Sequence, residues 1–121
     1  MPSLDRVNAF VAAVMSNDHV TAIEDFYWEG ASTQENGQPP LVGRDRLVAK
    51  ERAFLERMRI HTHPPRAVLV DADQVAIFWV FEITDPTGVV RRREELALQT
   101  WRDDRIVSER FFYDPAETVP I

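Results

Sequence analysis

Residues 74–84 read QVAIFWVFEIT, and this stretch decides the fold. Its alternate apolar residues share one face of a β-strand: Val75, Ile77, Trp79, Phe81 and Ile83. Ala76, Phe78 and Val80 make the opposite face apolar as well. A strand that is apolar on both faces needs a cover on each side. We expect helices on one side and a second copy of the chain on the other, which predicts a homodimer through the outer face of the sheet.

Strand patterns flank this stretch on both sides. After Met58 the apolar period is two, and turn signals at 71–73, 85–88 and 102–104 divide the chain into strands over 60–70, 74–84, 89–101 and 105–113. Such short turns favour antiparallel neighbours. Pro64 and Pro65 interrupt the first of these strands and place it at a sheet edge or a bulge, because proline has no backbone donor.

The chain before Met58 has helical spacing. One helix is expected over 4–15 with Ser3 as its N-cap, and a second begins after Asp18 and leaves through Gly30. A short strand over 31–36 follows, and a third helix runs from Gly43 to about residue 58. The order α-α-β-α-β-β-β-β predicts one α+β domain over 1–121, with three helices packed on a strongly curved mixed or antiparallel sheet that encloses a pocket.

Composition excludes several classes of function. The net charge of -6 and the pI near 5.0 offer no positive field for DNA or RNA, so no nucleic-acid partner is expected. The absence of cysteine excludes disulfides and thiolate chemistry and is consistent with the cytoplasm. No apolar run is long enough to span a membrane, and the N-terminus does not read as a signal peptide, so no membrane partner is expected.

Four stretches in this order resemble the SnoaL-like group of the nuclear-transport-factor-2-like superfamily: FYWEGA at 26–31, GRDRL at 43–47, DDRI at 103–106 and FFYDP at 111–115. The resemblance implies a cone-shaped α+β fold with a deep apolar cavity, commonly dimeric. Its members include ketosteroid isomerases, polyketide cyclases, epoxide hydrolases, dehydratases and non-catalytic binding proteins. A shared fold does not choose among these activities.

Glu35 resembles the position of the ketosteroid isomerase base. Partial burial would raise its pKa toward a range useful for proton transfer; alternatively it is a strand-end residue bonded to a loop or an arginine. Its neighbour Asn36 is either a substrate donor or a turn residue. The resemblance also implies two enolate-stabilising donors, which fall at Phe10 or Val11 and near Ala97, and none of these side chains can donate a hydrogen bond. This argues against ketosteroid isomerase chemistry, and the acids of the epoxide hydrolase pattern are missing too.

Other candidate groups lie on the strands. His61 and His63 alternate and share a face, so they could serve as acid and base, share a metal, or be surface residues. Gln99, Glu109 and Tyr113 become the polar anchors of an aromatic cavity if the last two strands turn that face inward. If the register of these strands differs by one residue, the same face turns outward, and its glutamates pair with arginines at the dimer interface instead.

The sequence therefore predicts a protein that binds a small molecule. If it is an enzyme, we expect acid–base chemistry without a metal or cofactor: isomerisation, cyclisation, dehydration or hydrolysis. The substrate would be a small apolar, polyketide-like or steroid-like molecule; the alternative is a non-catalytic binding or accessory protein. Catalysis is assigned to Glu35 as base with His61, His63 and Tyr113 as acids or donors. The predicted ligand-binding residues are Tyr27, Asn36, Phe54, Met58, Trp79, Phe81, Gln99, Trp101, Glu109 and Phe111.

Overall fold

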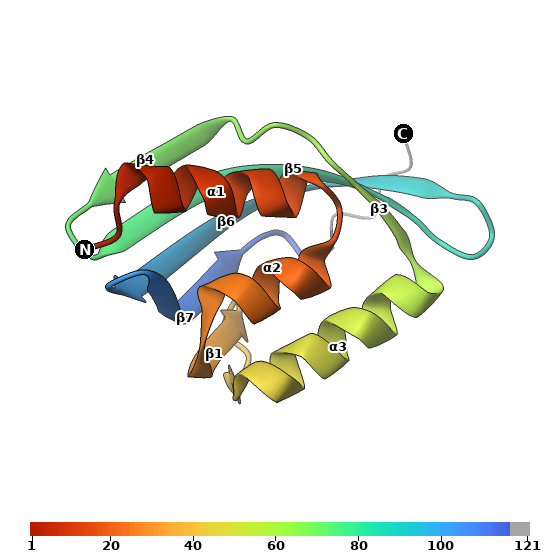
Figure 1. The fold of residues 1–121 in the computed structure, drawn as a ribbon. Helices are drawn as coiled ribbons and strands as arrows, with labels where there is room; N and C mark the ends of the chain where they lie inside the picture. Colours follow the sequence, from red (N-terminus) through yellow and green to blue (C-terminus); the bar gives the residue numbers. More distant parts are fainter. Residues whose placement is uncertain (117–121) are drawn as a thin grey trace.

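The computed structural model describes residues 1–116, in which three helices cover one face of a curled sheet that does not close (Figure 1). The helices are α1 (Leu4–Met15), α2 (His19–Phe26) and α3 (Arg44–Arg57). The strands are β1 (Tyr27–Glu35), β2 (Leu41–Val42), β3 (Arg59–Thr62), β4 (Ala67–Asp71), β5 (Gln74–Thr84), β6 (Val90–Arg102) and β7 (Arg105–Phe112). The predicted α+β class is confirmed, as are the positions of the first and third helices and the start of the second. Ser3 and Asp18 cap α1 and α2 by accepting hydrogen bonds from the backbone N–H groups of Arg6 and Thr21.

The strands form one mixed sheet in the order β2-β1-β7-β6-β5-β3, with β4 also paired to β5. All described pairings are antiparallel except that of β1 with β7. The parallel pair brings the strand that leaves α2 beside the last strand of the chain. Residues about 80 positions apart in the sequence, such as Tyr27 and Glu109, thereby become neighbours.

The predicted strand over 60–70 is two strands. β3 pairs with the end of β5, Thr62 opposite Phe81, and β4 pairs with its beginning, Ala67 opposite Phe78. The connection contains both prolines, which lack the N–H that a continuous ladder needs.

The predicted helix exit at Gly30 is wrong, since α2 ends at Phe26 and Gly30 lies inside β1. A Cβ at Gly30 would come within 2.5 Å of the Trp28 ring. The indole of Trp28 therefore lies over the strand where glycine leaves room for it.

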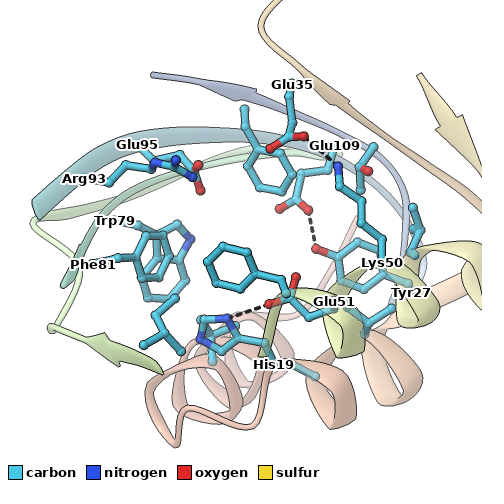
Figure 2. Close-up of a pocket in the computed structure, with 18 of the residues that line it drawn as sticks. His19, Tyr27, Glu35, Lys50, Glu51, Trp79, Phe81, Arg93, Glu95 and Glu109 are labelled. Carbon is cyan, nitrogen blue, oxygen red and sulfur yellow. Dashed lines mark hydrogen bonds and ion pairs between the residues drawn. The ribbon is translucent and has the colours of Figure 1, made fainter. Parts of the chain in front are cut away.

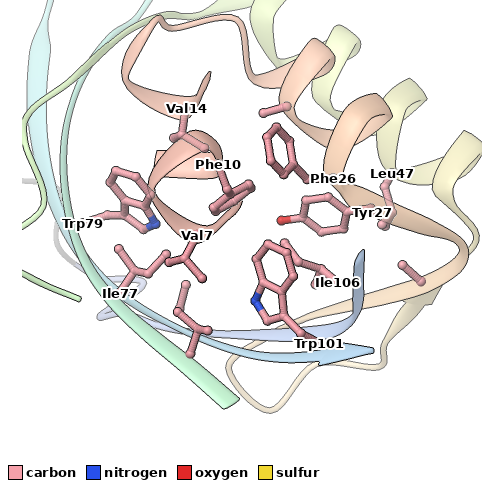
Figure 3. Packing of buried hydrophobic residues seen from close by; sticks show 14 of the residues in the cluster. Val7, Phe10, Val14, Phe26, Tyr27, Leu47, Ile77, Trp79, Trp101 and Ile106 are labelled. Carbon is pink, nitrogen blue, oxygen red and sulfur yellow. The ribbon is translucent and has the colours of Figure 1, made fainter. Parts of the chain in front are cut away.

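The core fills the space between α1 and the middle of the sheet (Figure 3). Val7 and Phe10 of α1 face the sheet residues Ile77, Trp101 and Ile106, all of which are buried. The ring of Phe10 meets that of Trp101 edge-on at 6.1 Å. Burying side chains of this size contributes about 1.5 to 3 kcal/mol each. Beyond this packing, the interior is open between the helices and the other end of the sheet, where Phe10 and Val14 of α1 also line the space.

Candidate functional site

A cavity of about 200 Å³ lies between the helices and the concave face of the sheet (Figure 2). One wall is apolar and contains Phe54, Ile60, Trp79 and Phe81, with the rings of Trp79 and Phe81 stacked at 5.8 Å. The volume is below the roughly 300–1,000 Å³ of pockets that hold drug-sized ligands, so the cavity suits a small molecule. Other apolar residues of the helices and strands complete the lining, together with these polar residues: His19, Tyr27, Thr33, Glu35, Lys50, Glu51, Arg93, Glu95 and Glu109.

Glu109 is a fully buried carboxyl held by donors on both oxygens. The Tyr27 hydroxyl donates to Oε1, and Nε2 of Gln99 donates to Oε2 at 2.6 Å. Gln99 is directly opposite Glu109 in the sheet, and Nε1 of Trp101 donates to its Oε1 at 3.0 Å, which fixes the amide orientation. Burial raises the pKa of Glu109 to about 7 although both hydrogen bonds favour the carboxylate. Glu109 therefore exchanges a proton near neutral pH.

Glu95 faces the same cavity in a very different environment. It is 8% exposed, and its carboxyl makes no hydrogen bond or ion pair with any residue of 1–116. Burial is the main reason that its pKa rises to about 8; Arg93 opposes the rise, and the charge of Glu109 adds to it. Glu95 is therefore a neutral acid at pH 7 that lines the same cavity as Glu109 (Figure 2).

A cluster of charged residues borders the cavity beyond Glu109. Nζ of Lys50 lies 2.6 Å from Oε2 of Glu35, and the Tyr113 hydroxyl donates to Oε1 at 3.1 Å. Burial raises the pKa of Glu35, but these hydrogen bonds and the charges of Lys50 and Arg93 outweigh it, so the net pKa is lowered. The expectation that the pKa of Glu35 would rise is wrong, because Lys50 on α3 supplies a counter-charge.

A histidine lines the helix side of the cavity. Nδ1 of His19 lies 3.4 Å from a carboxylate oxygen of Glu51, and its Nε2 lies 3.0 Å from the Thr62 hydroxyl. The ring packs edge-on against Phe81 at 5.8 Å. Its position at the start of α2 and the two partners hold the imidazole against the cavity wall.

Residues 7–109 match the SnoaL-like domain. The chain belongs to the SnoaL-like domain family. No curated protein sequence matches this family member. Many solved structures share its fold. A proposed SnoaL-like polyketide cyclase from Mesorhizobium loti is 23% identical, with a TM-score of 0.79 over 90% of this chain and 97% of that one.

Two further structures are similarly close. A proposed polyketide cyclase from Pseudomonas putida KT2440 is 16% identical, with a TM-score of 0.82 over 97% of this chain and 95% of that one. An LEH-like epoxide hydrolase from M. tuberculosis is 15% identical, with a TM-score of 0.78 over 94% and 84%. At these identities the likeness shows the fold of the SnoaL-like domain and leaves its chemistry open.

The structure brings half of the predicted site residues to the cavity: Tyr27, Glu35, Phe54, Trp79, Phe81, Glu109 and Phe111. Gln99 and Trp101 do not line the cavity. Gln99 donates a hydrogen bond to Glu109, and Trp101 donates one to Gln99. Tyr113 lies beside Glu35, and the side chain of Asn36 accepts a hydrogen bond from the backbone N–H of Tyr113. Met58 is partly buried at the end of α3 and does not line the cavity.

His61 and His63 are not brought to the cavity. Ile60 and Thr62 are the inward residues of β3, so alternation turns both imidazoles outward. The two rings lie 4.7 Å apart, and Nε2 of His63 is 3.3 Å from Glu82. Within residues 1–116 no cluster of three or more potential ligands could hold a metal ion, and no helix is long and apolar enough to cross a membrane.

The predicted site omitted six polar residues of the cavity: His19, Thr33, Lys50, Glu51, Arg93 and Glu95. Glu95 had a usable signal, because strict alternation places it on the same strand face as Gln99 and Trp101. His19, Lys50 and Glu51 had none, since only the packing of α2 and α3 against the sheet turns them toward the cavity.

Proposed function

We propose that this SnoaL-like protein binds a small, largely apolar molecule and performs acid–base chemistry on it with Glu95 and Glu109. The observation that carries the proposal is the nine-tenths buried carboxyl of Glu95, which has no hydrogen-bond or ion-pair partner within residues 1–116 and lines the same cavity as Glu109. Titratable groups whose surroundings move their pKa values toward neutrality are typical of proton-transfer sites. The cavity requires no cofactor for this chemistry.

The two carboxyls suit different roles. Glu95, neutral at pH 7, donates a hydrogen bond to a substrate oxygen such as a carbonyl. Glu109, in its ionised form, takes a proton from the adjacent carbon, and the C–H electron pair moves toward the oxygen that Glu95 stabilises. Return of the proton from Glu109 to another carbon gives isomerisation. If the substrate carries a β-hydroxyl, the enolate electron pair forms a C=C bond as the hydroxyl leaves with the proton from Glu109 as water, which gives dehydration. Tyr27 and Gln99 keep the carboxylate of Glu109 oriented while it is ionised.

Proton exchange into a simple ketone tests this proposal. We expect the protein to accelerate exchange of the α-hydrogens of phenylacetone with D₂O, measured by ¹H NMR. Loss of a general acid or base typically costs about 10²- to 10⁴-fold, so Glu109→Gln and Glu95→Gln should each slow exchange by at least about 10²-fold. Glu94→Gln, adjacent in sequence but on the opposite strand face, is the matched control. Exchange in Glu109→Gln at the wild-type rate would refute the assignment.

Glu35 remains a predicted base, so Glu35→Gln should be measured in the same proton-exchange assay. Its ion pair with Lys50 stabilises the carboxylate and makes it a weaker base than Glu109. Glu35→Gln should therefore slow exchange less than Glu109→Gln does. The opposite ranking would return the role of base to Glu35.

A second candidate is a non-catalytic binding protein. Phe10 and Ala97, which occupy the positions where the family resemblance implies enolate donors, are buried apolar residues. This candidate predicts a small molecule retained through purification, visible by native mass spectrometry, with no acceleration of proton exchange in any variant.

We also propose that the protein is a homodimer through the outer sheet face. Phe78, Leu96 and Phe112 form one cross-strand row there, and Leu69 and Leu98 lie in the next row. Leu69 is 66% exposed and Leu96 41%. Such a continuous apolar patch on a small protein favours association. Leu96→Lys should convert a dimer into a monomer by sedimentation analysis, whereas Leu4→Lys on α1 should not.

A further inference from the structure

Arg93 differs from the two arginines before it. Arg91 Nη1 lies 2.7 Å from Asp85, and Arg92 Nη2 lies 3.4 Å from Glu94. Arg93 is opposite Phe81 on β5, and like Phe81 it lines the cavity. Its guanidinium lies over the ring of Tyr113, 4.4 Å from the centroid, and forms no hydrogen bond or ion pair with any residue between 1 and 116.

The carboxyls near Arg93 do not neutralise it. Glu35 is already bonded to Lys50 Nζ at 2.6 Å and to the Tyr113 hydroxyl at 3.1 Å. Glu95, two residues along the same strand face, is neutral at pH 7 because its pKa is about 8. The other two acids of the cavity have partners of their own: Glu51 lies beside His19, and Glu109 accepts from Tyr27 and Gln99. Among residues 1–116, Arg93 is therefore a cation of the cavity lining that no carboxylate pairs with.

We infer that the ligand carries a carboxylate that binds the guanidinium of Arg93. This inference rests on the proposed function and names the substrate class of the same site. The planar guanidinium offers a fork of donors that matches a carboxylate, and such charge-assisted bonds are stronger where water is partly excluded. The stacking on Tyr113 orients the fork without using its N–H groups.

The spacing of the strand restricts the rest of the ligand. Residues two apart on one strand face are about 6 to 7 Å apart, so the group that reaches Glu95 lies a few bonds from the carboxylate at Arg93. The apolar part of the ligand would pack on two rings of β5 that line the cavity. Trp79 lies opposite Glu95, and Phe81 lies opposite Arg93. The substrate class is a small aryl or branched-chain carboxylic acid with an oxygen function near its acid group.

A matched pair of probes tests the inference. 3-Phenylpropanoate and its neutral amide have the same shape and differ in charge, and their binding can be measured by calorimetry. A charge-assisted contact contributes about 1.5 to 3 kcal/mol, so the acid should bind the wild type about 10- to 100-fold more tightly than the amide at pH 7. In Arg93→Gln this ratio should fall to near one. Arg92→Gln, the adjacent arginine on the outer face, should keep the wild-type ratio.

The outcomes separate this inference from the proposed function. Equal binding of acid and amide to the wild type, or an unchanged ratio in Arg93→Gln, would overturn the carboxylate site while leaving a small-molecule cavity. Loss of the preference for the acid over the amide in Arg92→Gln would place the bound carboxylate on the outer face of the sheet. That result would also overturn the carboxylate site at Arg93. Failure of both probes to bind the wild type would count against the cavity as a small-molecule site and so against both proposals.

Discussion

Replacing Glu95 with glutamine should change how the stability of the protein depends on pH. The pKa of Glu95 is about 8 in the folded state and near 4.5 in the unfolded chain. Below pH 4.5 the carboxyl is protonated in both states and carries no penalty. As the pH rises from 4.5 to 8, the unfolded state ionises while the folded state stays neutral, so the wild type loses stability across this window. At about 1.4 kcal/mol per pH unit, the loss reaches about 5 kcal/mol at most.

Glutamine does not ionise, so the Glu95→Gln variant lacks this loss. Urea unfolding followed by tryptophan fluorescence at pH 5, 6, 7 and 8 measures the difference. We expect the free energy of unfolding of the variant, relative to wild type, to increase by about 4 kcal/mol between pH 5 and pH 8. The slope is the readout, because any constant cost of the amide cancels. Glu94→Gln, whose side chain is 39% exposed, should show no such slope. Parallel profiles for Glu95→Gln and wild type would refute the neutral acid.

Three other substitutions test the supports of the site and the fold. Gln99→Leu removes a donor that lowers the pKa of Glu109, the proposed base, so the acidic limb of the pH–rate profile for proton exchange should move to higher pH. The Trp101 N–H that loses its partner should cost about 1 to 3 kcal/mol in urea unfolding. Asp18→Ala removes the N-cap of α2 and should cost about 1 kcal/mol by thermal unfolding; an unchanged midpoint would contradict the cap. Gly43→Ala introduces a side chain at a φ of 109° and should destabilise the protein by about 1 kcal/mol or more, whereas Gly37→Ala, with open space at its Cβ, should be near neutral.

The sequence was sufficient for the fold class, for the three helices and for the long strands of the second half of the chain. The period of two in residues 74–84 identified β5, and the polar residues at 3 and 18 identified the starts of two helices. Pro64 and Pro65 indicated an interruption between β3 and β4. The register of the two strands depends on their pairing with β5. The parallel pairing of β1 with β7 has no local signal, because it joins segments at opposite ends of the chain.

The site was predicted less completely for a physical reason. The alternation of residues along the strand placed Glu95 and Gln99 on one face, but it did not determine whether that face is buried or exposed to solvent. The burial of both residues shows that it faces inward. Polarity would have favoured the opposite answer, since a buried, unpartnered carboxyl is unfavourable. The residues that local rules place on the surface are therefore the ones that give this cavity its chemistry.

The cost of Glu95 is itself informative about function. A folded chain of this length is typically stable by about 5 to 15 kcal/mol, so a loss of several kcal/mol above neutral pH is a large fraction of the total. A leucine or glutamine of similar size would avoid it. The packing around Val7, Ile77 and Trp101 provides the stability that offsets the cost. Within residues 1–116, Glu95 makes no hydrogen bond or ion pair that would compensate for its burial. In the proposed function a ligand oxygen supplies that missing partner, which gives the buried carboxyl a role that packing alone does not.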